Sequence, residues 1–172
     1  KILATTGYKG IILDLRNNPG GFLEVAVDIA GWFLNPGDLV AIEQFGKAEN
    51  NNKTEFRANG LSGLKNYPVV VLVNQGTASA SEILAGALRD NRSVKLVGEK
   101  TFGKGSVQEL VNLKDGSSLK VTVAKWLTPK GVSISEHGLD PDYKISVTEQ
   151  DTENKKDPQL DKAVEILSKM IK

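Results

Sequence analysis

The sequence predicts an α/β fold on the basis of three observations. Two short apolar runs, residues 10–16 and 68–73, each end in a turn containing Asn and Gly and lead into a segment with helical periodicity. An unalternating apolar run closed by turn residues is typical of a buried parallel strand. An Asp-Gly pair at positions 115–116 separates two further strand-like segments, which is a hairpin signal. We therefore expect a mostly parallel sheet flanked by helices, followed by an antiparallel hairpin.

The predicted elements alternate along most of the chain. Residues 46–63 are polar and predict an exposed loop or an irregular hairpin. The final helix is marked most clearly, because Asp157 can cap it and Pro158 suits its first position. The expected elements are a strand at 10–16, a helix at 22–34, strands at 39–45 and 68–73, a helix at 78–89, a strand at 94–97, hairpin strands at 107–113 and 118–127, and a helix from 158 onward.

The composition excludes several kinds of chemistry. The 172 residues include no cysteine and one histidine, His137. Disulfides, thiolate metal sites, cysteine nucleophiles and multi-histidine metal sites are therefore excluded, and we expect no cofactor or metal. With 22 Lys and Arg against 21 Asp and Glu, the net charge of +1 provides no basic field for nucleic acid. The length suits one domain, residues 1–172.

The turns after the two apolar runs are the first candidates for a functional site. In a parallel sheet both turns lie at the carboxyl edge, where ligands bind, and free backbone N–H groups there can hold an oxyanion. Ser79 lies at the second turn and is presented much as in a nucleophile elbow. The alternative is structural: Ser79 and Glu82 fit a helix capping box, and Thr77 is a second possible cap.

The loop at residues 98–105 resembles the start of a phosphate-binding loop. Gly105 stands where such a loop needs Ser or Thr, and a strand-like segment follows in place of a helix, so nucleotide binding is disfavoured. A different role is open to Lys104, since a buried lysine with a lowered pKa can act as a base. Gly103 and Gly105 allow tight packing around it. The alternative is a glycine-rich turn with a solvated lysine.

Four more polar residues have a predicted role or position. Gln108 lies four residues after Lys104, and on a strand the two side chains would share a face, so that Gln108 can orient the amine; the alternative is an ordinary exposed side chain. His137 lies in a polar stretch rich in turn residues and is expected on the surface. Asp14 and Arg16 at a strand end predict a structural ion pair.

Four segments together resemble one known family, the carboxyl-terminal processing peptidases, also called tail-specific proteases. They are residues 11–21, 77–83, 98–108, and 127–131 with its continuation at 138–142. The resemblance implies the α/β core shared with ClpP and crotonase-like proteins, and endoproteolysis near the carboxyl termini of proteins by a Ser–Lys dyad. It assigns Ser79 as the nucleophile, Lys104 as the general base and Gln108 as the residue that orients the lysine.

The same resemblance implies an oxyanion hole and partners. The backbone N–H of Ala80, with that of Gly20 or Gly21, matches the oxyanion hole. The family also carries a PDZ domain that docks substrate tails, so residues 1–172 are expected to be an N-terminally truncated protease core lacking it. The family is mostly extracytoplasmic, in the periplasm, at the cell surface or secreted, and a homo-oligomer is possible. The rival interpretation is a non-catalytic binding module on the same fold.

Overall fold

The strands form two sheets in the computed structural model, which describes residues 7–46 and 52–171. Within these residues one sheet is parallel and has the order β1-β4-β5-β8. Its strands are β1 (Ile11–Asp14), β4 (Val69–Val73), β5 (Lys95–Gly98) and β8 (Tyr143–Lys144). The other sheet is antiparallel, in the order β3-β2-β7-β6, with β3 (Lys53–Arg57), β2 (Leu39–Phe45), β7 (Ser118–Leu127) and β6 (Ser106–Asn112).

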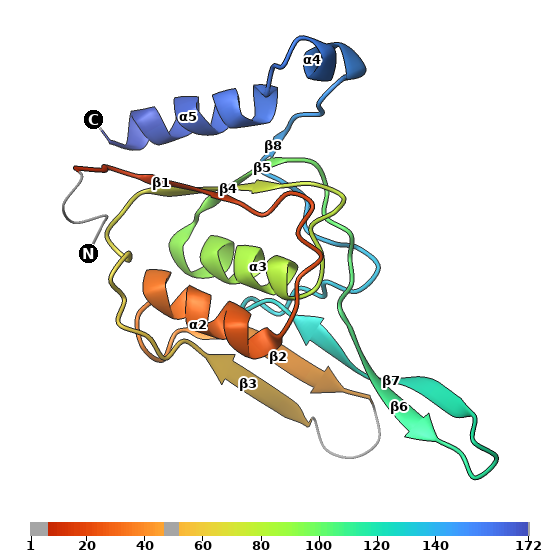
Figure 1. Ribbon diagram of the computed structural model, residues 1–172. Helices are drawn as coiled ribbons and strands as arrows, with labels where there is room; N and C mark the ends of the chain where they lie inside the picture. The colour runs from red at the N-terminus through yellow and green to blue at the C-terminus, as the bar shows by residue number, and fades with distance from the viewer. Residues whose placement is uncertain (1–6, 47–51, 172) are drawn as a thin grey trace.

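Four helices among the described residues complete the fold as layers around the sheets. They are α2 (Leu23–Phe33), α3 (Ala80–Arg92), α4 (Glu149–Glu153) and α5 (Pro158–Met170). Figure 1 shows α5 above the parallel sheet, α3 and α2 below it, and the antiparallel sheet beneath these two helices. Helices α2 and α3 begin on the same side of the molecule, at the right of Figure 1, where β6 also begins.

Strand β4 explains why the parallel sheet is covered on both faces. All five of its residues are apolar and buried, as expected for a central parallel strand. Val69, Val71 and Val73 belong to the core that includes residues of α2 and α3, whereas Val70 and Leu72 belong to the core on the side of α5. The two-residue period of the strand therefore supplies both cores from one segment.

The predicted fold class is confirmed, with one difference in arrangement. Strand β2 leaves the parallel sheet and pairs with β3 and β7, so the hairpin is part of a second sheet. The polar segment at 46–63 contains β3, which makes it the irregular hairpin and not a plain loop; residues 47–51 of it lie outside the described residues. The sequence did not predict β8 or α4, which are short elements of two and five residues.

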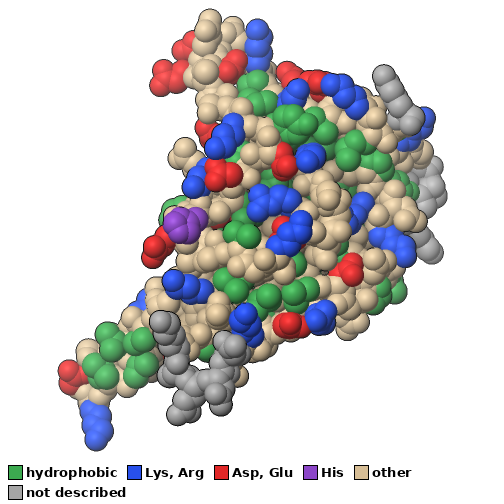
Figure 2. Space-filling view, turned by 180° about the vertical axis from the view of Figure 1, so that it is seen from behind, with side chains coloured by type: hydrophobic (Ala, Val, Ile, Leu, Met, Phe, Trp, Pro, Cys, Tyr) green, Lys and Arg blue, Asp and Glu red, His purple; other side chains and the backbone are tan. Residues whose placement is uncertain are grey.

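The β6–β7 hairpin projects from the body of the molecule (Figure 1). Strand β7 pairs with β2 from Ala124 to Leu127, and residues 118–122 pair with β6 alone within the described chain. Val111, Leu119 and Val121 are exposed on this arm. Figure 2 shows the projecting arm from behind, with apolar side chains gathered on it.

Candidate active site

The two turns that follow β1 and β4 are in direct contact. The backbone N–H of Asn17 donates to the Asn74 side-chain oxygen at 2.9 Å, and the Asn74 amide donates back to the Asn17 side-chain oxygen at 3.0 Å. The N–H of Ala78 donates to the carbonyl of Asn18 at 3.0 Å. The prediction that both turns share one edge of the sheet is therefore confirmed, because β1 and β4 are adjacent parallel strands.

Ser79 occupies a sharp turn between β4 and α3. Its backbone has φ 54° and ψ −122°, a conformation that a non-glycine residue rarely adopts. Such strain is typical of a serine on a strand-to-helix elbow, where it lifts the side chain out of the turn. Thr77 is not the cap, because its hydroxyl donates to the Leu15 carbonyl at 2.7 Å and so ties the end of β4 to β1.

Gly20 makes the closest approach of the first turn to Ser79. A Cβ added to Gly20 would lie 2.6 Å from the Ala78 carbonyl oxygen and 2.8 Å from the Ala80 nitrogen, and its φ is +88°. A side chain is therefore excluded there by both contact and conformation. Gly21 differs, because a Cβ added to it would meet nothing within 4 Å.

The backbone donors near Ser79 are not equally available. The Gly20 N–H donates to the Asn18 side-chain oxygen at 3.0 Å. In the described part of the chain no hydrogen bond engages the N–H of Gly21 or of Ala80. Ala80 is the first residue of α3, where helix geometry leaves the N–H without an intrahelical acceptor. These two N–H groups are therefore available to an anionic oxygen.

Glu82 holds the serine turn and the lysine loop together. Its side chain is fully buried, and one carboxylate oxygen accepts from the backbone N–H groups of Ser79 and Lys104, both at 2.9 Å. The other oxygen accepts from the Gly103 N–H at 2.8 Å and the Thr101 hydroxyl at 2.5 Å. One carboxylate thus fixes the backbone of both residues that the resemblance assigns to the dyad.

Sequence reasoning missed this role of Glu82. The Ser-x-x-Glu spacing predicted the capping-box bond to the Ser79 N–H, and that bond is present. The hydrogen bonds from residues 101–104 to Glu82 come from a segment about twenty positions later in the chain. The spacing of residues within a helix cannot predict such long-range bonds. A usable signal was the long buried stretch of α3: an acidic residue among side chains that are apolar on all faces requires donors around it.

The expectation that Lys104 is buried is wrong in this structure. Its side chain is exposed, and no hydrogen bond joins it to Ser79 within the described residues. The flanking glycines pack the backbone and leave the amine outside. A Cβ added to Gly103 would lie 2.9 Å from the Gly138 nitrogen, and one added to Gly105 would lie 2.3 Å from the Ser135 nitrogen.

The spacing argument for Gln108 also fails. Strand β6 begins at Ser106, after Lys104, and a register shift between Val107 and Gln108 interrupts the alternation of faces. Four residues of separation therefore do not place the two side chains on one face. Gln108 is exposed, and its role as the partner of Lys104 stays a prediction that rests on the resemblance.

The predicted surface position of His137 and the predicted ion pair of Asp14 with Arg16 are both confirmed. His137 is exposed on the loop after β7, where Figure 2 shows it in purple. Arg16 forms ion pairs with Asp14 at 2.7 Å and with Asp157 at 2.8 Å, which tie the end of β1 to the start of α5. The Arg16 hydrogen bond, opposed by partial burial, holds the pKa of Asp157 below its usual value.

In residues 7–46 and 52–171, no three His, Cys, Asp or Glu side chains come together in a way that could hold a metal ion. The helices of the described segments are all too short or too polar to cross a bilayer.

Comparison with known proteins supplies the family context. The model of Peptidase family S41 matches residues 1–145. A carboxyl-terminal-processing protease of Synechocystis sp. is 52% identical over 141 residues, which are 81% of this chain and 32% of that protein. A chloroplastic C-terminal processing peptidase of Tetradesmus obliquus is 45% identical over 83% of this chain and 30% of its own length.

The fold of a solved protease is similar as well. The photosystem II D1 C-terminal processing protease superposes with a TM-score of 0.74 at 42% identity, over 84% of this chain and 36% of that one. The chain thus spans about a third of the length of these curated relatives.

Proposed function

Because this chain belongs to peptidase family S41, we propose that it forms the catalytic core of a serine endopeptidase that cleaves proteins near their carboxyl termini. Ser79 is the nucleophile and Lys104 the general base. The observation that carries the proposal is the elbow itself: Ser79 in a strained turn, beside unengaged N–H groups, with Glu82 binding its backbone and that of Lys104.

The reaction proceeds by acylation and hydrolysis. The neutral amine of Lys104 takes the hydroxyl proton of Ser79 as its oxygen attacks the carbonyl carbon of the scissile bond. The resulting ammonium gives a proton to the leaving amine as the carbon–nitrogen bond breaks. Water, deprotonated by the same amine, then hydrolyses the ester and restores Ser79.

Ala80 and Gly21 supply the oxyanion hole in this proposal. Both N–H groups are free of intramolecular partners among the described residues, whereas the Gly20 N–H already donates to Asn18. An anion that developed near Gly20 would have to compete with that bond. Gly20 serves instead to let the two turns approach each other.

Lys104 must change its side-chain conformation for this reaction. Its amine has to come within about 3 Å of the Ser79 hydroxyl, which is the usual reach between a nucleophile and its base. Because the backbone N–H groups of both residues donate to the same Glu82 oxygen, the two backbones lie close together, and this supports a rotation about the side-chain bonds of Lys104 as the required change. Gln108 would then accept a hydrogen bond from the amine and orient its lone pair.

The names of the relatives support a proposal for the substrates and location of this protein. They are named as processing proteases of carboxyl termini, and one of them is chloroplastic. We accordingly place the substrates of this protein among protein and peptide carboxyl termini, and its location outside the cytoplasm, in the periplasm, at the cell surface or secreted. A PDZ domain that docks the substrate tail and a homo-oligomeric assembly belong to the same proposal, with residues 1–172 as the protease core.

Labelling by a fluorophosphonate tests the nucleophile. The probe phosphonylates activated serines, so mass spectrometry of the labelled chain is expected to find the adduct on Ser79 and to find none in Ser79→Ala. Ser117→Ala, which removes an exposed serine from the hairpin turn, is the matched control and should label like the parent. Absence of labelling on Ser79 would instead favour the non-catalytic binding module.

A further inference from the structure

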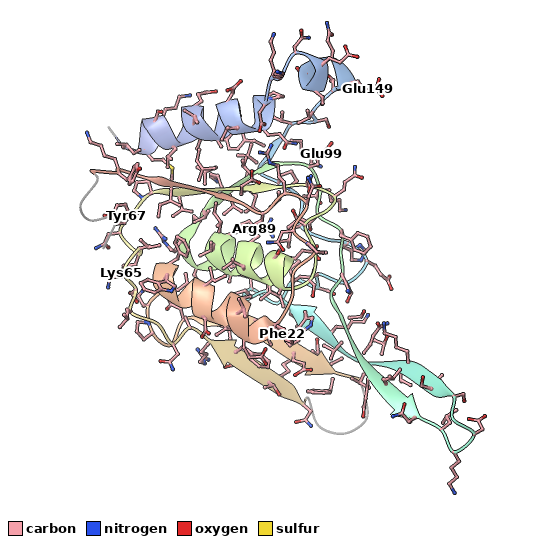
Figure 3. All side chains as sticks on the ribbon, in the orientation of Figure 1. Phe22, Lys65, Tyr67, Arg89, Glu99 and Glu149 are labelled. Atoms are coloured by element: carbon pink, nitrogen blue, oxygen red, sulfur yellow. The ribbon has the colours of Figure 1, made fainter. Side chains whose placement is uncertain are left out.

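Helix α2 carries an apolar stripe that is exposed in the described part of the chain. Phe22, at its N-cap, is 78% exposed, and Val25, Ile29 and Trp32 are 51%, 37% and 49% exposed. Their spacing of three, four and three residues places them on one face of the helix. Figure 3 shows Phe22 at the start of α2, on the side where α3 also begins. Contiguous exposed apolar side chains of this kind are typical of a binding surface.

A cavity lies between the first part of this stripe and Ala80, the residue that follows Ser79. It measures about 240 Å³, and Gly20, Gly21 and Ala80 line it at the end that adjoins the elbow. Phe22, Val25 and Ile29 line it on the side of α2, with Ala26, Leu15 and Leu84 also contributing. Its lining contains no charged side chain, and its polar members are Asn18 and Ser81. An occupant is therefore apolar where it faces α2.

We propose that the exposed face of α2 binds several successive apolar residues of the substrate on the amino-terminal side of the cleaved bond. This inference rests on the proposed function, which fixes one point of the substrate. The scissile carbonyl must lie at Ser79 with its oxygen toward Ala80 and Gly21. The side chain next to that carbonyl then lies at the mouth of the cavity.

The length of the stripe sets how much substrate it can hold. From position 22 to 32 a helix rises about 15 Å, at about 1.5 Å per residue. An extended peptide advances about 3.3 Å per residue, so about four or five substrate residues can follow the stripe. Substrates with an apolar segment just before the cleaved bond are therefore preferred, and such segments are accessible in unfolded chains.

The hairpin offers a built-in comparison. Leu119 is 53% exposed on the projecting arm, close to the 51% of Val25, but unlike Val25 it does not line the cavity. A charge at Leu119 changes the exposed apolar area of the molecule by a similar amount. It therefore controls for nonspecific adhesion of an apolar peptide.

The test measures peptide binding in the Ser79→Ala chain, where no turnover occurs. The probe is a fluorescein-labelled peptide with four consecutive apolar residues, and fluorescence anisotropy gives its Kd. Ile29→Glu and Trp32→Glu should each weaken binding about tenfold or more, the loss expected when a charge replaces a buried apolar contact. Leu119→Glu should leave the Kd within about twofold. An unchanged Kd in Ile29→Glu, or an equal loss in Leu119→Glu, overturns the proposal.

Two further measurements keep the result interpretable. Thermal unfolding shows that each variant is folded, and a peptide carrying lysine among its apolar residues should regain affinity for Ile29→Glu, which a misfolded variant would not show. Fluorophosphonate labelling of the parent tests the proposed function separately. If the peptide binds as expected but Ser79 is not labelled, the protease proposal fails and the binding surface stands; if Ser79 is labelled but no peptide binds, the surface is wrong.

Discussion

Ser79 and Lys104 share one carboxylate through their backbones, yet their side chains lie in different surroundings. Ser79 is half-buried in a strained elbow against Gly20, whereas the Lys104 side chain is exposed to solvent. Buried hydrogen bonds to Glu82 thus set where the two backbones lie. They do not set where the amine points. Position and reactivity of a catalytic pair can therefore depend on different parts of a fold.

The largest effect is expected when the amine of Lys104 is removed. Lys104→Met keeps the length of the side chain and should slow fluorophosphonate labelling of Ser79 about 100-fold or more, the usual range for losing a general base. The rate in the parent should rise with pH, because only the neutral amine accepts a proton, and the variant should lose this rise. Rates are measured under pseudo-first-order conditions from pH 6 to 10.

Lys100→Met is the matched control for this prediction. Lys100 is an exposed lysine of the same loop, 3.7 Å from Asp140. Its replacement should leave the labelling rate and its pH dependence unchanged. Equal rates in Lys104→Met and the parent would mean that the exposed amine seen here has no part in activating Ser79.

Glu82→Gln tests whether the carboxylate of Glu82 stabilises both the Ser79 turn and the Lys104 loop. Glutamine replaces one acceptor oxygen with an N–H₂ group, which would face two donors. Since hydrogen bonds to a charged group each contribute about 1.5–3 kcal/mol, we expect a loss of about 3 kcal/mol in the free energy of unfolding by urea. Slower labelling of Ser79 should accompany it, because its elbow loses a support.

The exposed Glu153 on α4 provides the comparison for Glu82. Glu153→Gln should change the free energy of unfolding by less than about 0.5 kcal/mol, as surface substitutions usually do. A Glu82→Gln chain as stable as the parent would show that the four hydrogen bonds are not needed to hold the turn and loop together.

The sequence predicted the serine side of this site better than the lysine side, for a physical reason. The turns near Asn17 and Asn74 are in contact because they follow two adjacent parallel strands. Both strands can be predicted from apolar runs in the sequence. The exposure of Lys104 depends on how residues 134–138 pack against its backbone, a long-range matter that glycine spacing does not encode. The assignment of Lys104 as the base therefore rests on the resemblance to the family. For Gln108, the two-residue period of a strand predicted a shared face with Lys104, which the register shift in β6 does not allow.

Gly20 and Gly21 of the first turn test how closely this turn approaches Ser79. Gly20→Ala should lower the free energy of unfolding by about 2 kcal/mol, because its φ of +88° is unfavourable for alanine and the new Cβ would meet the Ala78 carbonyl. Gly21→Ala should cost less than about 0.5 kcal/mol, since the added Cβ meets nothing within 4 Å. Urea unfolding measures both, and the reverse order would contradict the close approach of the turns at Gly20.

The smallest effect is expected for the ion pair between Arg16 and Asp157, which holds the start of the first turn against the start of α5. The bond from Arg16 lowers the pKa of Asp157, so its ionised form stabilises the folded state. This contribution is complete above the unfolded pKa of about 3.9 and is lost as the pH falls through the lower, folded value. Because the pair is partly exposed, we expect Arg16→Gln to cost only about 1 kcal/mol at pH 7.

The difference between Arg16→Gln and the parent should shrink as the pH falls from 7 to 3, because the stabilisation by ionised Asp157 declines below its unfolded pKa and is lost as the pH falls through its lowered folded pKa. Asp157 also caps α5 through the Leu160 N–H at 2.9 Å, and that bond is common to the two proteins, so comparing them reports the ion pairs of Arg16 with Asp157 and Asp14. Urea unfolding at pH 7 and pH 3 measures the change. A difference that stays constant between the two pH values would show that the charge of Asp157 does not help to anchor the turn beside Ser79, and that Arg16 acts through its other contacts, among them its hydrogen bond to Gln159.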